Sequence, residues 1–384
     1  MSFRYLDLFS GAGGFSLGLE LAGLLPVGAV EADRFACETF KHNFPHTPLF
    51  EGDIRNLTKP RIQNQYGGVE LIVAGPPCQG FSVAGPSQYG IIDERNYLIL
   101  EVLRFVKILS PRFFIVENVK GLLSGRLSPE KKAFKEFIGK VQEAGYETKH
   151  FVLQAADYGV PQWRERVFIF GARHKNDLPE EIPRRFGNIT QPWCTVWDAL
   201  SDLPPADYGT GQENFMEYIS EAKNPYQQWL RSSSNGLTNH VAMKHTQRLI
   251  ARFLKIPIGG SLVDVPAEFG QRVRNGSDLD IRSRFKMNNQ RLDPKKISTA
   301  ITASFQSNFV HPFLHRNLTA REGARLQSFP DRFTFLGPRT LMSKSLLKRE
   351  GRHDEIGLSQ YNQIGNAVPP LMAHAVGMEI IKKL

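Results

Sequence analysis

Cysteine is scarce in this chain of 384 residues, which has only Cys37, Cys78 and Cys194. So small and scattered a set argues against a disulfide framework and against a zinc site, and we expect no bound metal. Reduced thiols are typical of the cytosol. The N-terminus has no signal-peptide pattern, and no apolar run is long enough to cross a bilayer. We therefore expect a soluble, cytoplasmic protein with no membrane partner.

Internal repeats and low-complexity tracts are also lacking, as are the G-x-G-x-x-G fingerprint and the P-loop lysine of common nucleotide sites. Hydrophobic residues make up 41% of the chain, which supports a large core, and the length fits two domains. The formal net charge of +10 suits a polyanionic partner such as nucleic acid.

Residues 3–171 alternate short apolar runs with stretches of helical length, such as 96–109 and 131–144. The candidate strands are Tyr5–Phe9, Val27–Val30, Leu71–Ala74, Phe113–Glu117, His150–Leu153 and Val167–Phe170. Such alternation is typical of βαβ units, so the sequence predicts an α/β fold with a doubly wound, mainly parallel sheet.

After Arg173 the periodicity fades, and prolines, glycines and polar clusters become frequent. This texture predicts a second, smaller domain of irregular structure. Residues 241–300 hold 12 Lys/Arg and 5 Asp/Glu, a local charge of +7, interleaved with Asn, Gln and Ser that can meet bases and phosphates. An ordinary solvated surface is the alternative. Apolar helical character returns at 371–384.

A glycine-rich loop, Asp7–Phe15, ends the first predicted strand and opens a helix. Two acids follow at the ends of the next strands. Glu31 lies about 20 residues beyond the loop, where an acid can accept from ribose hydroxyls, and Asp53 could accept from an adenine amino group. Each feature alone also fits a tight turn or a helix cap. Together they favour a nucleoside pocket.

Cys78 follows the predicted strand Leu71–Ala74 and the rigid pair Pro76-Pro77. Open α/β sheets build their sites at the carboxyl ends of strands, so this thiol is placed to act as a nucleophile. A buried small hydrophobic residue is the alternative.

Glu117 ends another buried strand, at the same expected edge of the sheet as Cys78. Partial burial would raise its pKa and let it donate or share a proton. A helix cap is the alternative. Arg164 and Arg166 flank an acid before the next strand, which suits either a donor cluster or a surface salt bridge.

These segments together resemble the C5-cytosine-specific DNA methyltransferases of the bacterial restriction–modification type. The matches follow the family's order along nearly the whole chain: Asp7–Phe15, Glu31, Asp53, Pro76–Gln79, Glu117–Val119, Gln162–Arg166, Arg316–Pro330 and Gln363–Pro370. In combination they are very specific.

The resemblance implies S-adenosyl-L-methionine as the methyl donor. The residues implied in its pocket are Phe9, Gly11, Gly13, Glu31, Asp53, Ile54, Pro76, Leu98 and Asn366. Ala32 departs from the bulkier side chain that family members often carry against the adenine, which leaves stacking on that face in doubt.

The resemblance also implies the catalytic roles. Cys78 adds to C6 of cytosine and makes C5 reactive, Glu117 contacts N3 and the exocyclic amine, Arg166 binds O2, and Arg164 supports the site. A stacked duplex hides C5 and C6, so the target base must be flipped out.

By the same resemblance, residues 1–185 with 360–384 form the catalytic and cofactor-binding domain, and 186–359 the target-recognition domain. The segment 337–359 looks like an insertion, either a phosphate contact or a solvated loop. The DNA-binding candidates are Gln79, Ser82, Arg272, Arg274, Arg282, Arg284, Asn288, Asn289 and Gln290. We expect a monomer that acts on double-stranded DNA in the nucleoid, with a cognate restriction endonuclease for the same site.

Two rival functions remain. An RNA-directed relative of the tRNA-modifying branch has a short recognition region with a Cys-Phe-Thr stretch, which this sequence lacks. A non-catalytic homologue would have lost the cysteine or the acid, and this chain keeps Cys78, Glu117 and both arginines.

Overall fold

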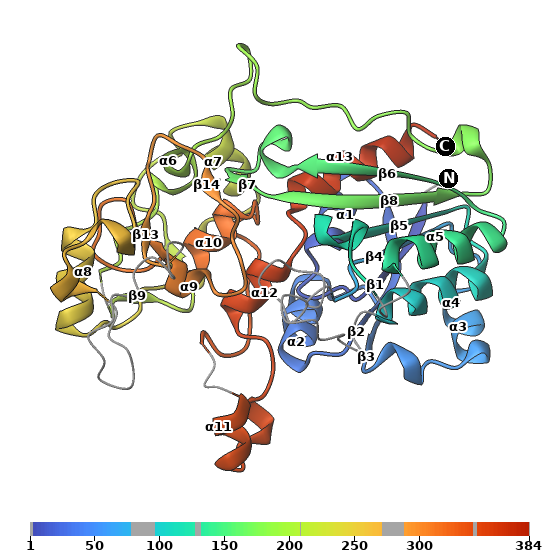
Figure 1. The fold of residues 1–384 in the computed structure, drawn as a ribbon, viewed down its shortest axis with the longest axis horizontal. Helices are drawn as coiled ribbons and strands as arrows, with labels where there is room; N and C mark the ends of the chain where they lie inside the picture. Colours follow the sequence, from blue (N-terminus) through green and yellow to red (C-terminus); the bar gives the residue numbers. More distant parts are fainter. Residues whose placement is uncertain are drawn as a thin grey trace. The chain divides into compact units, whose positions relative to one another are not determined.

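The computed structural model describes residues 3–77, 97–126, 132–207, 209–270, 288–340 and 344–383 (Figure 1). The chain divides into two compact units, each of which is described by itself. Unit 1 comprises residues 1–159, 164–191 and 367–384, and unit 2 comprises 160–163 and 192–366. Residues 360–366 thus group with unit 2, although the sequence led us to expect them in the first domain.

Unit 1 is built on a seven-stranded sheet with the order β3-β2-β1-β4-β5-β8-β6. Its strands are β1 (Arg4–Leu8), β2 (Leu25–Glu31), β3 (Leu49–Glu51), β4 (Leu71–Ala74), β5 (Phe113–Asn118), β6 (Glu147–Gln154) and β8 (Glu165–Ala172). The first five pair in parallel, and β8 runs antiparallel to both β5 and β6. The predicted mainly parallel α/β sheet is therefore confirmed.

The helices of unit 1 are α1 (Gly14–Leu21), α2 (Arg34–Asn43), α3 (Lys59–Tyr66), α4 (Ile99–Leu109), α5 (Ala133–Glu143) and α13 (Pro370–Ile381). The helical stretches expected at 96–109, 131–144 and 371–384 correspond to α4, α5 and α13. None of the helices in the described ranges has both the length and the apolar character that a membrane crossing requires.

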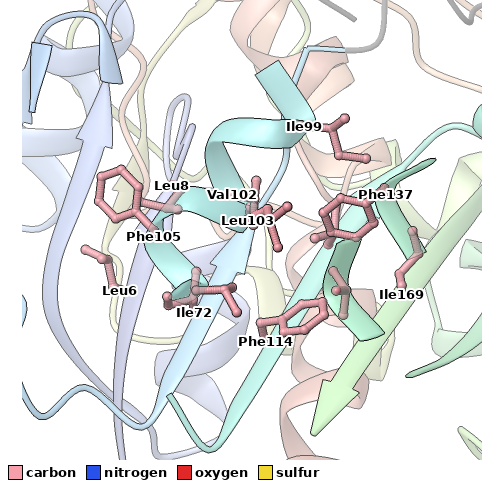
Figure 2. Close-up of a cluster of buried hydrophobic side chains, with 14 of the residues drawn as sticks. Leu6, Leu8, Ile72, Ile99, Val102, Leu103, Phe105, Phe114, Phe137 and Ile169 are labelled. Carbon is pink, nitrogen blue, oxygen red and sulfur yellow. The ribbon is translucent and has the colours of Figure 1, made fainter. Parts of the chain in front are cut away.

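One face of the sheet carries the main hydrophobic core, where strand side chains meet α3, α4 and α5. Figure 2 shows Leu6, Leu8, Ile72, Phe114 and Ile169 of the strands beside side chains of α4 and α5. Successive strand residues point to opposite faces, so Tyr5 and Asp7 belong to the other face. Helix α1 covers them there, because the Tyr5 hydroxyl donates to the carbonyl of Ser16 at 3.2 Å.

Helices α1 and α13 pack closely on that second face of the sheet. A Cβ built at Gly18 of α1 would lie 2.4 Å from the Cβ of Ala373 in α13, so only glycine permits this approach. The C-terminal helix thereby stabilises the helix that follows the glycine-rich loop.

Unit 2 consists of short elements, and its strands are only two residues long. The strands and helices of unit 2, in chain order, are β7 (Gln162–Trp163), α6 (Val196–Leu200), β9 (Gly211–Gln212), β10 (Met216–Glu217), α7 (Pro225–Leu230), β11 (Gly236–Leu237), β12 (His240–Val241), α8 (Gln247–Lys255), β13 (Gln290–Arg291), β14 (Ser298–Thr299), α9 (Phe305–Asn308), β15 (Phe309–Val310), α10 (Ala320–Leu326), α11 (Lys344–Arg349) and α12 (Gln360–Asn366). This confirms the predicted smaller region of irregular structure.

Buried arginine–carboxylate pairs hold unit 2 together around α10. Arg316 contacts Glu322 at 2.7 Å, and Arg325 contacts Asp331 at 2.6 Å, with all four side chains almost fully buried. A guanidinium can bind a carboxylate through two parallel hydrogen bonds, which fixes geometry where regular backbone pairing is short. Removing one partner would leave the other charge buried and unpaired.

Candidate active site

The carboxyl ends of β4 and β5 lie side by side, because Ala74 pairs with Val116 in parallel register. The next residues therefore also meet. A Cβ at Gly75 would lie 3.8 Å from Oε2 of Glu117, and the Asn118 side-chain amide donates to the carbonyl of Pro76 at 3.2 Å. Strand β5 thus fixes the chain that leads to Cys78. Cys78, Gln79 and Ser82 themselves lie outside the described residues.

Glu117 forms an ion pair with Arg166, with 2.9 Å between Oε1 and Nε. Glu117 lies opposite Phe168 in the antiparallel β5–β8 pair, so Arg166, two residues earlier on β8, shares its face. Only 8% of Glu117 is exposed. Burial raises the pKa of its carboxyl, and the positive charges of Arg166 and Arg164 oppose that rise without cancelling it. The site thus favours the protonated acid more than water does.

Arg164 is buried, and its hydrogen bonds hold two neighbouring segments in place. Its backbone N–H donates to the side chain of Gln154, and Nη2 donates to the carbonyl of Ala367 at 3.1 Å. It thereby links the start of β8 to the residue after Asn366. Sequence reasoning missed Gln154, since a lone glutamine at the end of an amphipathic strand carries no signal.

Gln162 belongs to unit 2, although the sequence groups it with the two arginines. Its amide is fully buried, accepts from the N–H of Ile301 at 3.0 Å and donates to the carbonyl of Leu326 at 2.8 Å. Its observed contacts are therefore structural ones within that unit.

The carboxylate of Glu31 holds the glycine-rich loop. Oε2 accepts from the N–H of Gly11 at 2.8 Å, while Oε1 accepts from the N–H groups of Ala32 at 2.8 Å and Asp33 at 2.7 Å. A carboxylate offers about four lone-pair sites, so about one remains for a ligand. Burial raises the pKa of Glu31, and these backbone bonds act against the rise.

Three loop residues have left-handed backbones, with φ of 61° at Phe9, 56° at Gly11 and 101° at Gly13. The two glycines differ in their surroundings. A Cβ at Gly13 would lie 2.3 Å from the ring of Phe44, whereas a Cβ at Gly11 would meet nothing within 4 Å. Packing explains Gly13, and Gly11 borders open space that a small molecule can enter.

Asp53 serves as a helix cap, the alternative that the sequence left open. Its carboxylate accepts from the N–H of Arg55 at 2.9 Å and pairs with the same residue's guanidinium at 3.0 Å, which holds the pKa of Asp53 low. Ile54 is buried behind it, and Leu98 packs against the main core. Asn366 ends α12 in unit 2 and is exposed.

Among the DNA-reading candidates, Arg272, Arg274, Arg282 and Arg284 lie outside the described residues. Asn289 is 9% exposed, and its amide donates to the carbonyl of Ser307 at 3.0 Å and accepts from Arg252 at 3.3 Å. These internal bonds argue against a base-reading role for Asn289. Asn288 is half-buried, and its backbone carbonyl accepts from Leu262.

Asp7 is a buried acid that sequence reasoning did not single out. Its Oδ2 accepts from the hydroxyl of Ser16 at 2.6 Å, and within the described ranges Oδ1 has no hydrogen-bond partner. Burial and the nearby Glu31 raise the pKa of Asp7 to about 7. The sequence signal for this residue is an aspartate in an otherwise apolar strand, at the start of the glycine-rich loop.

The family model of the C-5 cytosine-specific DNA methylases matches residues 3–382 of this sequence. The chain belongs to this family. It is accordingly a DNA (cytosine-5-)-methyltransferase, and the resemblance read from the motifs is confirmed.

Individual relatives agree with that assignment. The methyltransferase is 42% identical over 379 residues to the type II methyltransferase M.DdeI of Desulfomicrobium norvegicum, covering 98% of this chain and 88% of the relative. Among solved structures it resembles an E. coli protein described as a DNA modification methyltransferase encoded within a prophage. The identity is 26%, the TM-score is 0.72, and 99% of each chain is covered.

A mutant of DNMT2 from Spodoptera frugiperda shares the fold of the methyltransferase. The TM-score is 0.54 at 19% identity, with 99% of this chain and 100% of that chain covered. At this identity the likeness concerns the fold alone.

Proposed function

We propose that this enzyme methylates C5 of a flipped-out cytosine within a specific duplex sequence, with S-adenosyl-L-methionine as donor, as part of a type II restriction–modification system. The observation that carries the proposal is the buried Glu117 with its raised pKa, paired with Arg166 beside the strand end that leads to Cys78. This combination puts an acid and a cation where a thiol is expected.

The residues around the glycine-rich loop fit the methyl donor. Open space adjoins Gly11, and the spare acceptor of Glu31 suits a ribose hydroxyl. Phe9, Ile54, Pro76 and Leu98 would border the same pocket. For Asp53 to accept from an adenine amino group, the ligand would displace part of its bonding to Arg55, which contacts both carboxylate oxygens. When bound, S-adenosyl-L-methionine supplies an electrophilic methyl group on a sulfonium.

Cys78 and Glu117 have separate roles in the reaction at the cytosine ring. C5 is a weak nucleophile, so the Cys78 thiolate first adds to C6 while Glu117 gives a proton to N3, which places electron density on C5. Arg166 binds O2, and Arg164 supports the site through Gln154 and Ala367. After methylation a base takes the proton from C5, the electron pair reforms the C5–C6 double bond, Cys78 leaves as the thiolate, and the N3 proton returns to Glu117.

Residues 186–359 are proposed to recognise the target, with the basic side chains of 271–287 as the leading candidates for base and phosphate contacts. The name of M.DdeI as a type II methyltransferase supports the restriction–modification setting. In that setting the enzyme protects a site that a cognate endonuclease cuts, and it acts as a monomer.

Bisulfite sequencing of host DNA, with the enzyme and its Cys78→Ala variant expressed separately, tests the proposal. We expect complete methylation of one short sequence by the wild type and none by the variant. A duplex with 5-fluorocytosine at that position should trap a covalent complex, because fluorine replaces the proton that must leave. Methylation of tRNA instead of duplex DNA, or turnover by the variant, would overturn the proposal.

A further inference from the structure

Arg252 of helix α8 binds both flanks of the basic segment 271–287 with one guanidinium group. Its Nε donates to the carbonyl of Phe269 at 2.5 Å, and its Nη2 donates to that of Gly270 at 2.8 Å. Its Nη1 donates to Oδ1 of Asn289 at 3.3 Å. Gly270 precedes the segment directly, and Asn289 follows it by two residues. We call this arrangement the Arg252 clasp.

Both flanks are held by further bonds. Arg248, one turn earlier on α8, donates to the carbonyl of Gly270 at 3.0 Å, and among the described residues it bonds to this flank and not to Asn289. Asn289 has a left-handed backbone with φ of 52° and is tied to Ser307 through its own amide. The second flank is therefore also held by bonds that do not involve Arg252.

Helix α8 is itself a firm support for the clasp. Its apolar side packs Phe253 and Ile256 into a buried cluster with Leu262, Val265 and Val310. At its C-terminal end Arg291 donates to the carbonyls of Phe253 at 2.5 Å and Ile256 at 2.8 Å. Carbonyls at a helix C-terminus need such donors, and a guanidinium supplies several at once.

The segment between the flanks carries five Lys/Arg and two Asp/Glu in 17 residues. Within the described ranges the partners of Arg252 are neutral carbonyl and amide groups, so its charge is not neutralised by an ion pair there. Holding together two points that are far apart in the sequence has an entropic cost, and a guanidinium that binds both points offsets part of it. Base readout depends on well-placed side chains.

We propose that Arg252 is a positioning residue for target-sequence recognition, because it fixes the two ends of segment 271–287 relative to each other. The proposal rests on the proposed function of this region in reading DNA. Arg252 is not among the residues proposed to contact the methyl donor or the reacting cytosine. Its loss therefore affects selectivity among DNA sequences and leaves the methyl-transfer chemistry in place.

The test compares Arg252→Gln, Arg252→Lys and Arg248→Gln on the cognate duplex and on duplexes with one changed base pair. We expect both Arg252 variants to lower the ratio of kcat/KM between cognate and changed duplexes by about tenfold or more, since one wrong base pair normally costs about 1–3 kcal/mol. The kcat on saturating cognate DNA and the affinity for S-adenosyl-L-methionine should stay close to those of the wild type. Lysine keeps the positive charge but lacks the planar set of N–H donors of a guanidinium, so Arg252→Lys should not restore selectivity. Arg248→Gln touches one flank only and should have a smaller effect.

Other outcomes overturn the inference. If Arg252→Lys behaves like the wild type while Arg252→Gln loses affinity uniformly for all duplexes, Arg252 is a phosphate contact. If both variants lose methyl-donor affinity or a large part of their thermal stability together with selectivity, Arg252 has only a general structural role. An unchanged selectivity ratio also refutes the clasp. A wild type that methylates no defined sequence refutes instead the proposed function.

Discussion

Glu117 and Arg166 form an ion pair, with Oε1 and Nε 2.9 Å apart on neighbouring antiparallel strands. Both are proposed to contact one cytosine, Glu117 at N3 and Arg166 at O2. The pair compensates the charge of a buried carboxylate, because an unpaired charge in this position would be costly.

Glu117→Gln should lower kcat by about 100-fold or more while binding of DNA and methyl donor persists, since general acid catalysis typically contributes about 10²–10⁴. Burial raises the pKa of Glu117, and only the protonated acid can donate. The wild-type rate should thus fall as pH rises through that pKa, and single-turnover rates should show no such fall in the variant. Glu165→Gln is the matched control, because Glu165 is exposed and pairs only with Lys120 at 3.2 Å among the described contacts.

In the Arg166→Gln variant, the fall in rate with rising pH should occur at higher pH than in the wild type. The rate itself should also be lower. Arg166 is the largest influence that lowers the pKa of Glu117, so removing it raises that pKa further. Single-turnover rates measured across pH at saturating DNA will check the direction. A fall that moves to lower pH would mean that Arg166 does not act on Glu117.

Gly11→Ala and Gly13→Ala should separate ligand binding from folding. A methyl group at Gly11 enters open space, so we expect mild destabilisation of about 1–2 kcal/mol from the left-handed backbone and a larger loss of affinity for the methyl donor. A methyl group at Gly13 would lie 2.3 Å from the Phe44 ring, so this variant should lose thermal stability first. Calorimetric titration and thermal unfolding measure the two effects. Equal losses of stability would contradict the distinction.

The sequence predicted those parts of the enzyme that depend on local pattern. Apolar runs interrupted by helical stretches gave the sheet, and the ends of β4 and β5 followed because parallel strands end at one edge. Contacts between distant residues escaped prediction. The pairing of Glu117 with Arg166 depends on β8 running antiparallel, which no local signal distinguishes from a parallel strand. Asn289 was a candidate for base contact in the sequence. Its bonds to Ser307 and Arg252 could not be foreseen there, because they depend on tertiary packing.

Asp7 provides a prediction on stability, because its pKa is raised from 3.8 to about 7 in the folded protein. Between these values the folded state holds a proton that the unfolded state releases. The contribution of Asp7 to folding stability must then fall as pH rises from about 4 to about 7 and stay level above that, by up to about 4 kcal/mol for a shift of this size.

Asp7→Asn mimics the protonated acid and does not titrate, so its stability relative to the wild type should improve from pH 5 to pH 8. Ser16→Ala is the companion variant. The Ser16 hydroxyl lowers the pKa of Asp7 by donating to it, so its removal should extend the decline to higher pH. Urea midpoints of the ligand-free proteins at several pH values measure both effects. Parallel curves for wild type and Asp7→Asn would mean that Asp7 is ionised in the fold throughout, and that the buried carboxylate is stabilised by some group other than Ser16.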